Sequence, residues 1–87
     1  MLTSTITIGA ITMPLEVFNA LETIIRLSKE GNGGSTGRNA ANHADDALYY
    51  CNTYEEFITA CSYVSSSLGT MRGEAIKEVR KVLKVLL

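Results

Sequence analysis

Residues 3–30 read TSTITIGAITMPLEVFNALETIIRLSKE, and a change of periodicity inside this stretch decides the fold. In residues 3–12 apolar residues alternate with threonine and glycine, which is the period-2 pattern of a half-buried strand. From residue 13 to residue 30 the apolar residues fall on one broad face at helical spacing. Thr12 is the expected N-cap of this helix, and Pro14 is tolerated in its first turn. We therefore expect a strand over residues 3–12 and a core helix over residues 13–30.

Three further helices are predicted after this one. Residues 31–37, GNGGSTG, hold four glycines in seven positions and are expected to form a flexible loop. A second helix is predicted over about residues 38–51, with a face of small residues that lets another helix approach closely. Thr53 and Glu56 form a capping-box pattern, so a third helix is predicted from Tyr54 to Leu68. The fourth helix, residues 71–87, has the clearest amphipathic pattern.

The predicted fold class is thus mainly α: an N-terminal β-strand followed by about four amphipathic helices in a small helical bundle. With 87 residues and no linker-like segment, the chain is expected to form a single domain over residues 1–87. A lone strand needs a partner for its backbone hydrogen bonds. Either the strands of two copies pair, or a short segment that reads as a loop turns out to be a strand. We prefer the first alternative and expect a homodimer.

The composition excludes several classes of protein. Apolar residues make up 46% and charged residues 20% of the chain, which is ordinary globular usage. No stretch approaches the roughly 18 uncharged apolar residues of a membrane span, and the amino terminus lacks the basic region of a secretory signal. Cys51 and Cys61 are too few and too widely spaced for a disulfide scaffold. We therefore expect a cytoplasmic protein that does not associate with a membrane.

A polar strip on the second predicted helix is the expected binding surface. It consists of Asn39, His43, Asp46 and Tyr50, spaced at i, i+4, i+7 and i+11. Such a strip can hold a partner or a polar ligand through hydrogen bonds, although strips of this kind are more often merely hydrated edges.

The sequence predicts no catalytic residue, no metal and no cofactor. A nucleophilic cysteine needs an exposed thiol made acidic by a cationic neighbour, whereas Cys51 and Cys61 lie on predicted apolar faces. Zinc usually needs four ligands in closely spaced pairs, and the chain offers two cysteines ten residues apart and one histidine, His43.

Two groups of residues are candidate sites for anions. Ser35, Thr36 and Arg38 follow the glycines at a helix start, where free backbone amides and hydroxyls can bind an anion, although the P-loop order and its lysine are missing. A basic strip on the last predicted helix consists of Lys77, Arg80, Lys81 and Lys84. It can meet phosphate or an acidic protein, but such strips are usually solvated, and basic residues near a helix end also complement its dipole.

The order of a strand, a helix that opens with MPLEVF, a glycine turn and a second helix resembles the ribbon-helix-helix family of dimeric DNA-binding regulators over roughly residues 3–50. The resemblance implies that paired strands enter the major groove and read base edges through side chains such as Thr5 and Thr7. The strand has no basic or amide side chain, and residues 1–71 hold three basic and seven acidic residues. Because lysine and arginine supply most non-specific DNA affinity, nucleic acid is an alternative partner and not the favoured one.

The preferred function is that of a non-enzymatic protein-interaction module, a small regulator or inhibitor of the kind that mobile elements also encode. It would act by occupying the surface of a macromolecular partner, most simply a protein. Charge segregation supports this function because residues 72–87 hold five basic and two acidic residues, which can steer an encounter. A second alternative is an oligomeric binder of a small anionic ligand, held by residues 35–38 and the polar strip.

Overall fold

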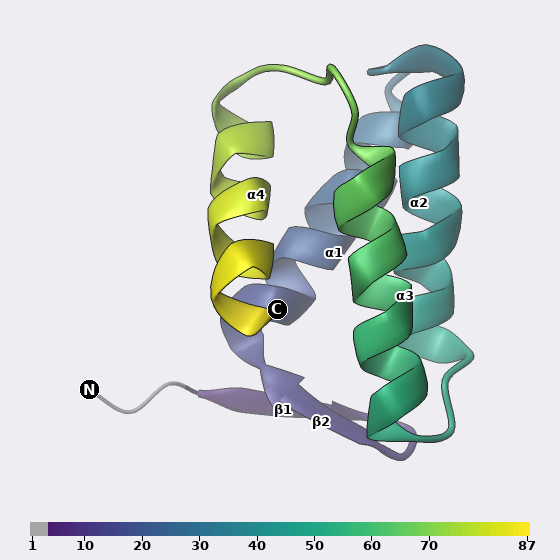
Figure 1. Ribbon diagram of the computed structural model, residues 1–87, viewed down its shortest axis with the longest axis vertical. Coiled ribbons are helices and arrows are strands. Elements are labelled where there is room, and N and C mark those ends of the chain that lie inside the picture. Colours follow the sequence, from purple (N-terminus) through teal and green to yellow (C-terminus); the bar gives the residue numbers. More distant parts are fainter. Residues whose placement is uncertain (1–3) are drawn as a thin grey trace.

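The computed structural model describes residues 4–87, which form a two-stranded hairpin followed by four helices (Figure 1). The elements are β1 (Thr5–Ile8), β2 (Ile11–Pro14), α1 (Leu15–Lys29), α2 (Gly34–Tyr49), α3 (Tyr54–Ser67) and α4 (Glu74–Leu86). The helices α1, α2 and α3 follow one another up, down and up, and α4 returns along α1. The predicted mainly α fold with a β element at the N-terminal side is confirmed.

The predicted strand over residues 3–12 is wrong in extent, because Gly9 and Ala10 form a turn that divides it. Ile8 pairs with Ile11 on either side of this turn, and the antiparallel pairing runs on to Thr5 and Pro14. Gly9 has a φ of 60°, and a glycine with positive φ at the first central position is typical of a type II′ hairpin turn. Residue 3, where the prediction began, lies outside the described residues.

The hairpin has an inner and an outer face because directly opposed residues point the same way. Ile11 and Met13 of β2 are buried, and Ile6 and Ile8 of β1 pack beside them against the core. On the outer face, the hydroxyls of Thr7 and Thr12 hydrogen-bond across the strands at 2.8 Å. Thr12 therefore lies within β2 and is not the N-cap of the helix as predicted.

The pairing of β1 with β2 within one chain removes one of the arguments for a homodimer. Neither alternative is the one observed: the predicted strand folds back on itself, and β2, formed by its last two residues with Met13 and Pro14, supplies the hydrogen-bond partners of β1. The ribbon-helix-helix resemblance implied one strand per copy, whereas this chain pairs two strands of its own. The homodimer no longer rests on an unpaired strand and stays a prediction, supported by the last helical turns, where Val85 is 85% exposed.

The glycine segment differs most from expectation, because α2 begins at Gly34 and not near Arg38. Gly33 is the N-cap with a φ of 81°, and Gly37 lies buried in the first turn of the helix. A Cβ atom on Gly37 would overlap the carbonyl oxygen of Asn32. The glycines therefore let α1 and α2 join through a tight connection, where the sequence suggested a flexible loop over residues 31–37.

The start of α3 follows the predicted capping box. The amide of Glu56 donates to Thr53 Oγ1 at 3.1 Å, and the carboxylate of Glu56 accepts from the amide of Asn52 at 2.8 Å. The side chain thus reaches the residue before the N-cap rather than the N-cap itself. Reciprocal bonds of this kind satisfy amides that a helix start leaves open.

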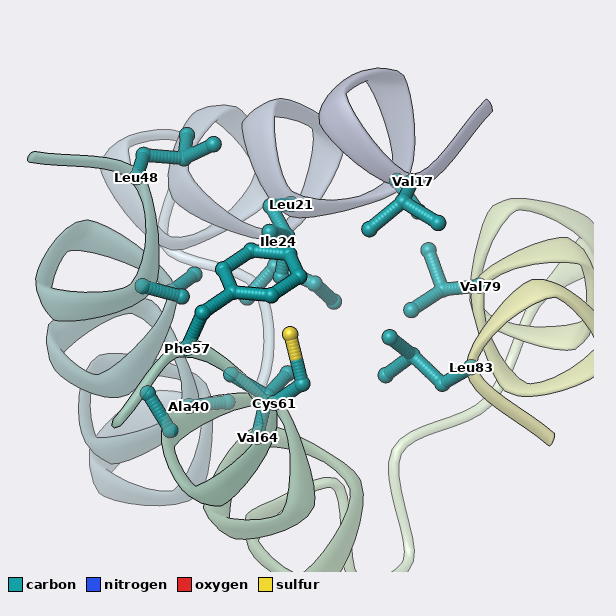
Figure 2. Packing of buried hydrophobic residues seen from close by; sticks show 14 of the residues in the cluster. Val17, Leu21, Ile24, Ala40, Leu48, Phe57, Cys61, Val64, Val79 and Leu83 are labelled. Atoms are coloured by element: carbon teal, nitrogen blue, oxygen red, sulfur yellow. The ribbon is translucent and has the colours of Figure 1, made fainter. Parts of the chain in front are cut away.

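Side chains from all four helices point into one core (Figure 2). Ala40, Ala44 and Ala47 of α2 are fully buried, so the predicted small face does pack against neighbouring helices. Phe57 of α3 is the largest fully buried side chain, and Cys61 lies beside it with no exposed surface. Helix α4 inserts Ile76, Val79 and Leu83 and packs mainly on α1. Within residues 4–87, no helix is long and apolar enough to cross a membrane.

Candidate functional site

The polar strip of α2 borders a groove between α2 and α3. The two helices are antiparallel neighbours joined by a four-residue turn, so the last turns of α2 lie beside the first turns of α3 (Figure 1). The groove, called here the α2–α3 groove, has a volume of about 540 Å³. Its lining residues are His43, Asp46, Tyr50, Cys51, Asn52, Glu55, Glu56, Thr59, Ala60 and Tyr63.

The structure brings three of the four predicted strip residues together in this groove. His43 is half-buried, whereas Asp46 and Tyr50 are exposed, and Tyr50 retains 71% of its surface. Asn39 is exposed one turn further toward the start of α2 and does not line the groove. Three residues of the predicted strip therefore share one groove, and their role in binding stays a prediction.

Helix α3 contributes the half of the groove that the sequence analysis missed. Glu55, Thr59 and Tyr63 repeat every four residues and line the opposite wall. The ring of Tyr63 is 53% exposed and lies 5.2 Å, centroid to centroid, from the ring of His43. The four-residue spacing was visible in the sequence. The sequence alone did not predict that this face of α3 lies beside the polar strip of α2.

The groove is acidic. Three of its ten lining residues, Asp46, Glu55 and Glu56, carry carboxylates, and none of the ten is lysine or arginine. Glu56 has one oxygen engaged in the helix cap. Asp46 and Glu55 are exposed, and within the described part of the chain neither carboxylate has an ion pair or a side-chain hydrogen bond.

The two cysteines differ in position. Cys61 belongs to the core as predicted, and its burial raises its pKa to about 12. Cys51 is half-buried: it packs against the edge of the core and also lines the groove. Its thiol donates to the carbonyl oxygen of Asp46 at 3.3 Å, and burial, with the nearby Glu56 and Asp46 carboxylates, raises its pKa. Both thiols are therefore held in the protonated form, which is unsuited to nucleophilic attack.

The candidate anion site lies in a helix and not at the end of a loop. Ser35, Thr36 and Arg38 lie within the first turns of α2 and not in a loop. Ser35 and Arg38 are exposed, and Thr36 is half-buried beside Gly69 of the α3–α4 connection. A depression of about 570 Å³ at this end of the bundle is lined by residues 69–74, Ile76, Lys77 and Arg80 and by none of these three.

The four residues of the basic strip on α4 differ in their contacts. The guanidinium of Arg80 donates to the carbonyl oxygens of Gly69 and Met71 at 2.8 and 3.2 Å, so it holds the α3–α4 connection. Lys77 lies 3.9 Å from a carboxylate oxygen of Glu74, and Lys81 lies 3.7 Å from one of Glu78. Lys84 is exposed in the last turn. Three of the four residues thus have partners on or near their own helix.

Within residues 4–87, no three histidine, cysteine, aspartate or glutamate side chains gather closely enough to hold a metal ion. The α2–α3 groove brings together three predicted site residues, His43, Asp46 and Tyr50, and it combines tyrosines with carboxylates. No protein-family model matches the sequence, and neither a curated protein nor a solved structure matches it.

Proposed function

We propose that this chain is a non-enzymatic protein-interaction module that holds a protein partner in the α2–α3 groove. The observation that carries the proposal is the exposure of two tyrosine rings, Tyr50 and Tyr63, on opposite walls of a single groove. Tyrosine combines a large rigid contact area with a polar hydroxyl and is enriched at the energetic centres of protein interfaces.

The neighbouring side chains favour a macromolecular partner over a small substrate. The groove runs along both helices and is open to solvent, whereas small-ligand sites usually enclose most of the ligand in an apolar cavity. His43 and Asp46 add hydrogen-bonding groups around the rings, which is the mixture typical of a polar interface. The protonated Cys51 and Cys61 thiols offer no activated nucleophile.

Site-specific photocrosslinking in living cells tests the proposal. A photoreactive phenylalanine analogue replaces Tyr63 in the groove, and a control protein carries it at Lys81, an exposed position on α4. We expect a discrete protein adduct from position 63 that is absent from position 81 and that weakens when Tyr50→Ser is added. Equal adducts from both positions, or none from position 63, would contradict the proposal.

A further inference from the structure

We infer that the partner presents a basic segment, with arginine or lysine side chains that enter the α2–α3 groove; this inference rests on the proposed function. Its first support is the charge of the groove. The carboxylates of Asp46 and Glu55 face the groove, and no lysine or arginine lines it. Opposite charges on a partner would neutralise them, and such complementarity selects partners and speeds their encounter.

The aromatic side chains point to the same chemistry. Tyr50 and Tyr63 expose 71% and 53% of their surfaces beside these carboxylates. A guanidinium can stack on a tyrosine ring while its N–H groups donate to a carboxylate, a combination that a neutral or acidic segment cannot make. The groove places both kinds of acceptor within one site of about 540 Å³.

The distribution of charged residues along α2 and α3 would also attract a basic partner from a distance. The last turns of α2 lie beside the first turn of α3 (Figure 1). Helix α2 carries Arg38 near its start and Asp45 and Asp46 near its end, and α3 has Glu55 and Glu56 in its first turn. Both helices therefore bring their acidic residues to the end of the bundle that contains the groove. A field of this sign attracts a basic segment before contact. A bare metal ion is a poorer occupant, because within the described residues no three ligating side chains gather to bind one.

Charge reversal at one helical position provides a matched variant. Asp46→Lys reverses a charge in the groove, and a lysine in the last turn of α2 complements the helix dipole, so folding is retained. Glu30→Lys is the control, because Glu30 is the exposed C-cap of α1 and lies outside the groove. Both variants change the net charge by the same amount.

The test is a selection of phage-displayed random peptides on the wild-type chain, followed by titration of the enriched peptides against the variants. We expect peptides rich in arginine and lysine that bind wild type and Glu30→Lys alike, and that bind Asp46→Lys about tenfold more weakly. Raising the salt concentration should weaken them as well.

The other outcomes separate the two proposals. Peptides that depend on Tyr63, as shown by Tyr63→Ser, but are not basic and ignore Asp46→Lys would overturn the basic partner and leave the interaction module standing. If no enriched peptide responds to Tyr63→Ser or Asp46→Lys, both proposals fail. A wild-type chain that assembles with rising concentration, and that Asp46→Lys returns to a monomer, would overturn a foreign partner in favour of a second copy.

Discussion

The substitution Gly37→Ala should destabilise the protein although it lies in a helix. An alanine in a helix is normally more stable than a glycine by about 1 kcal/mol. Gly37 lacks a positive φ, so its backbone conformation does not oppose the change. A Cβ at this position, however, would overlap the carbonyl oxygen of Asn32 and lie 3.2 Å from its carbon and 3.5 Å from Met71 Cε. The added Cβ would therefore collide mainly with backbone atoms.

Neither backbone segment can move away freely. The amide of Asn32 donates to the carbonyl of Leu27 at 2.9 Å, and the amide of Gly37 donates to the carbonyl of Gly33 at 3.0 Å. Overpacking of this kind costs about 1–3 kcal/mol. Because the overlap is with a backbone oxygen, the upper part of this range applies, about 2–3 kcal/mol, and subtracting the helical preference for alanine of about 1 kcal/mol leaves a net loss of about 1–2 kcal/mol. In a domain of this size such a loss lowers Tm by about 5–15 °C.

Urea unfolding followed by circular dichroism measures the loss. Ser35→Ala is the control, since Ser35 is exposed in the same turn, and its stability should stay within about 0.5 kcal/mol of wild type. A Gly37→Ala protein as stable as wild type, or more stable, would refute the close approach of α2 to the preceding connection.

Three further changes test the chemistry of the fold. Burial raises the Cys61 pKa from 9.0 to about 12, so the stability contributed by the protonated thiol is complete below pH 9 and is lost as the pH rises through 12. Between pH 8 and pH 10 the free energy of unfolding of wild type should therefore fall by about 1.4 kcal/mol more than that of Cys61→Ala. Denaturant titrations at both pH values measure this difference. Arg80→Met should cost about 1 kcal/mol in the same assay, because it removes the hydrogen bonds to the α3–α4 connection, while Lys84→Met should change little. Thr53→Ala should lower the melting temperature through a cap loss of about 1 kcal/mol, and Thr59→Ala should not; equal effects would refute the cap.

Periodicity predicted the elements that bury a continuous apolar face. The helix predicted over residues 13–30 appears as α1 from Leu15 to Lys29, with Met13 and Pro14 in β2 instead. The cap at Thr53 and the buried Cys61 appear as predicted. Burial of apolar faces supplies most of the stability of a helix, which is why their pattern is predictive. Local glycines misled the prediction twice. Gly9 makes a hairpin turn inside a continuous alternating pattern, and the glycines before Arg38 permit close packing where flexibility was expected.

The sequence pattern predicted the residues on one wall of the α2–α3 groove and not those on the other. His43, Asp46 and Tyr50 were found because they repeat along one helix, which periodicity reveals. The opposite wall, with Tyr63 at its centre, depends on which face of α3 meets that strip. This choice is made by core packing between distant residues, and a single sequence carries no direct record of it. The role of Arg80 was missed for the same reason, since its acceptors are carbonyl groups of a connection.

The uneven attachment of α4 has a consequence for folding order. Helices α1, α2 and α3 contact their neighbours in sequence, whereas α4 packs mainly on α1, across the whole intervening chain. Short loops close at less entropic cost than long ones, so the three consecutive helices can assemble before α4 docks. The protein then contains a sub-globular unit that opens first. Backbone amides of α4 should exchange with solvent through a lower-energy opening than those of α3, even while the rest of the core stays closed.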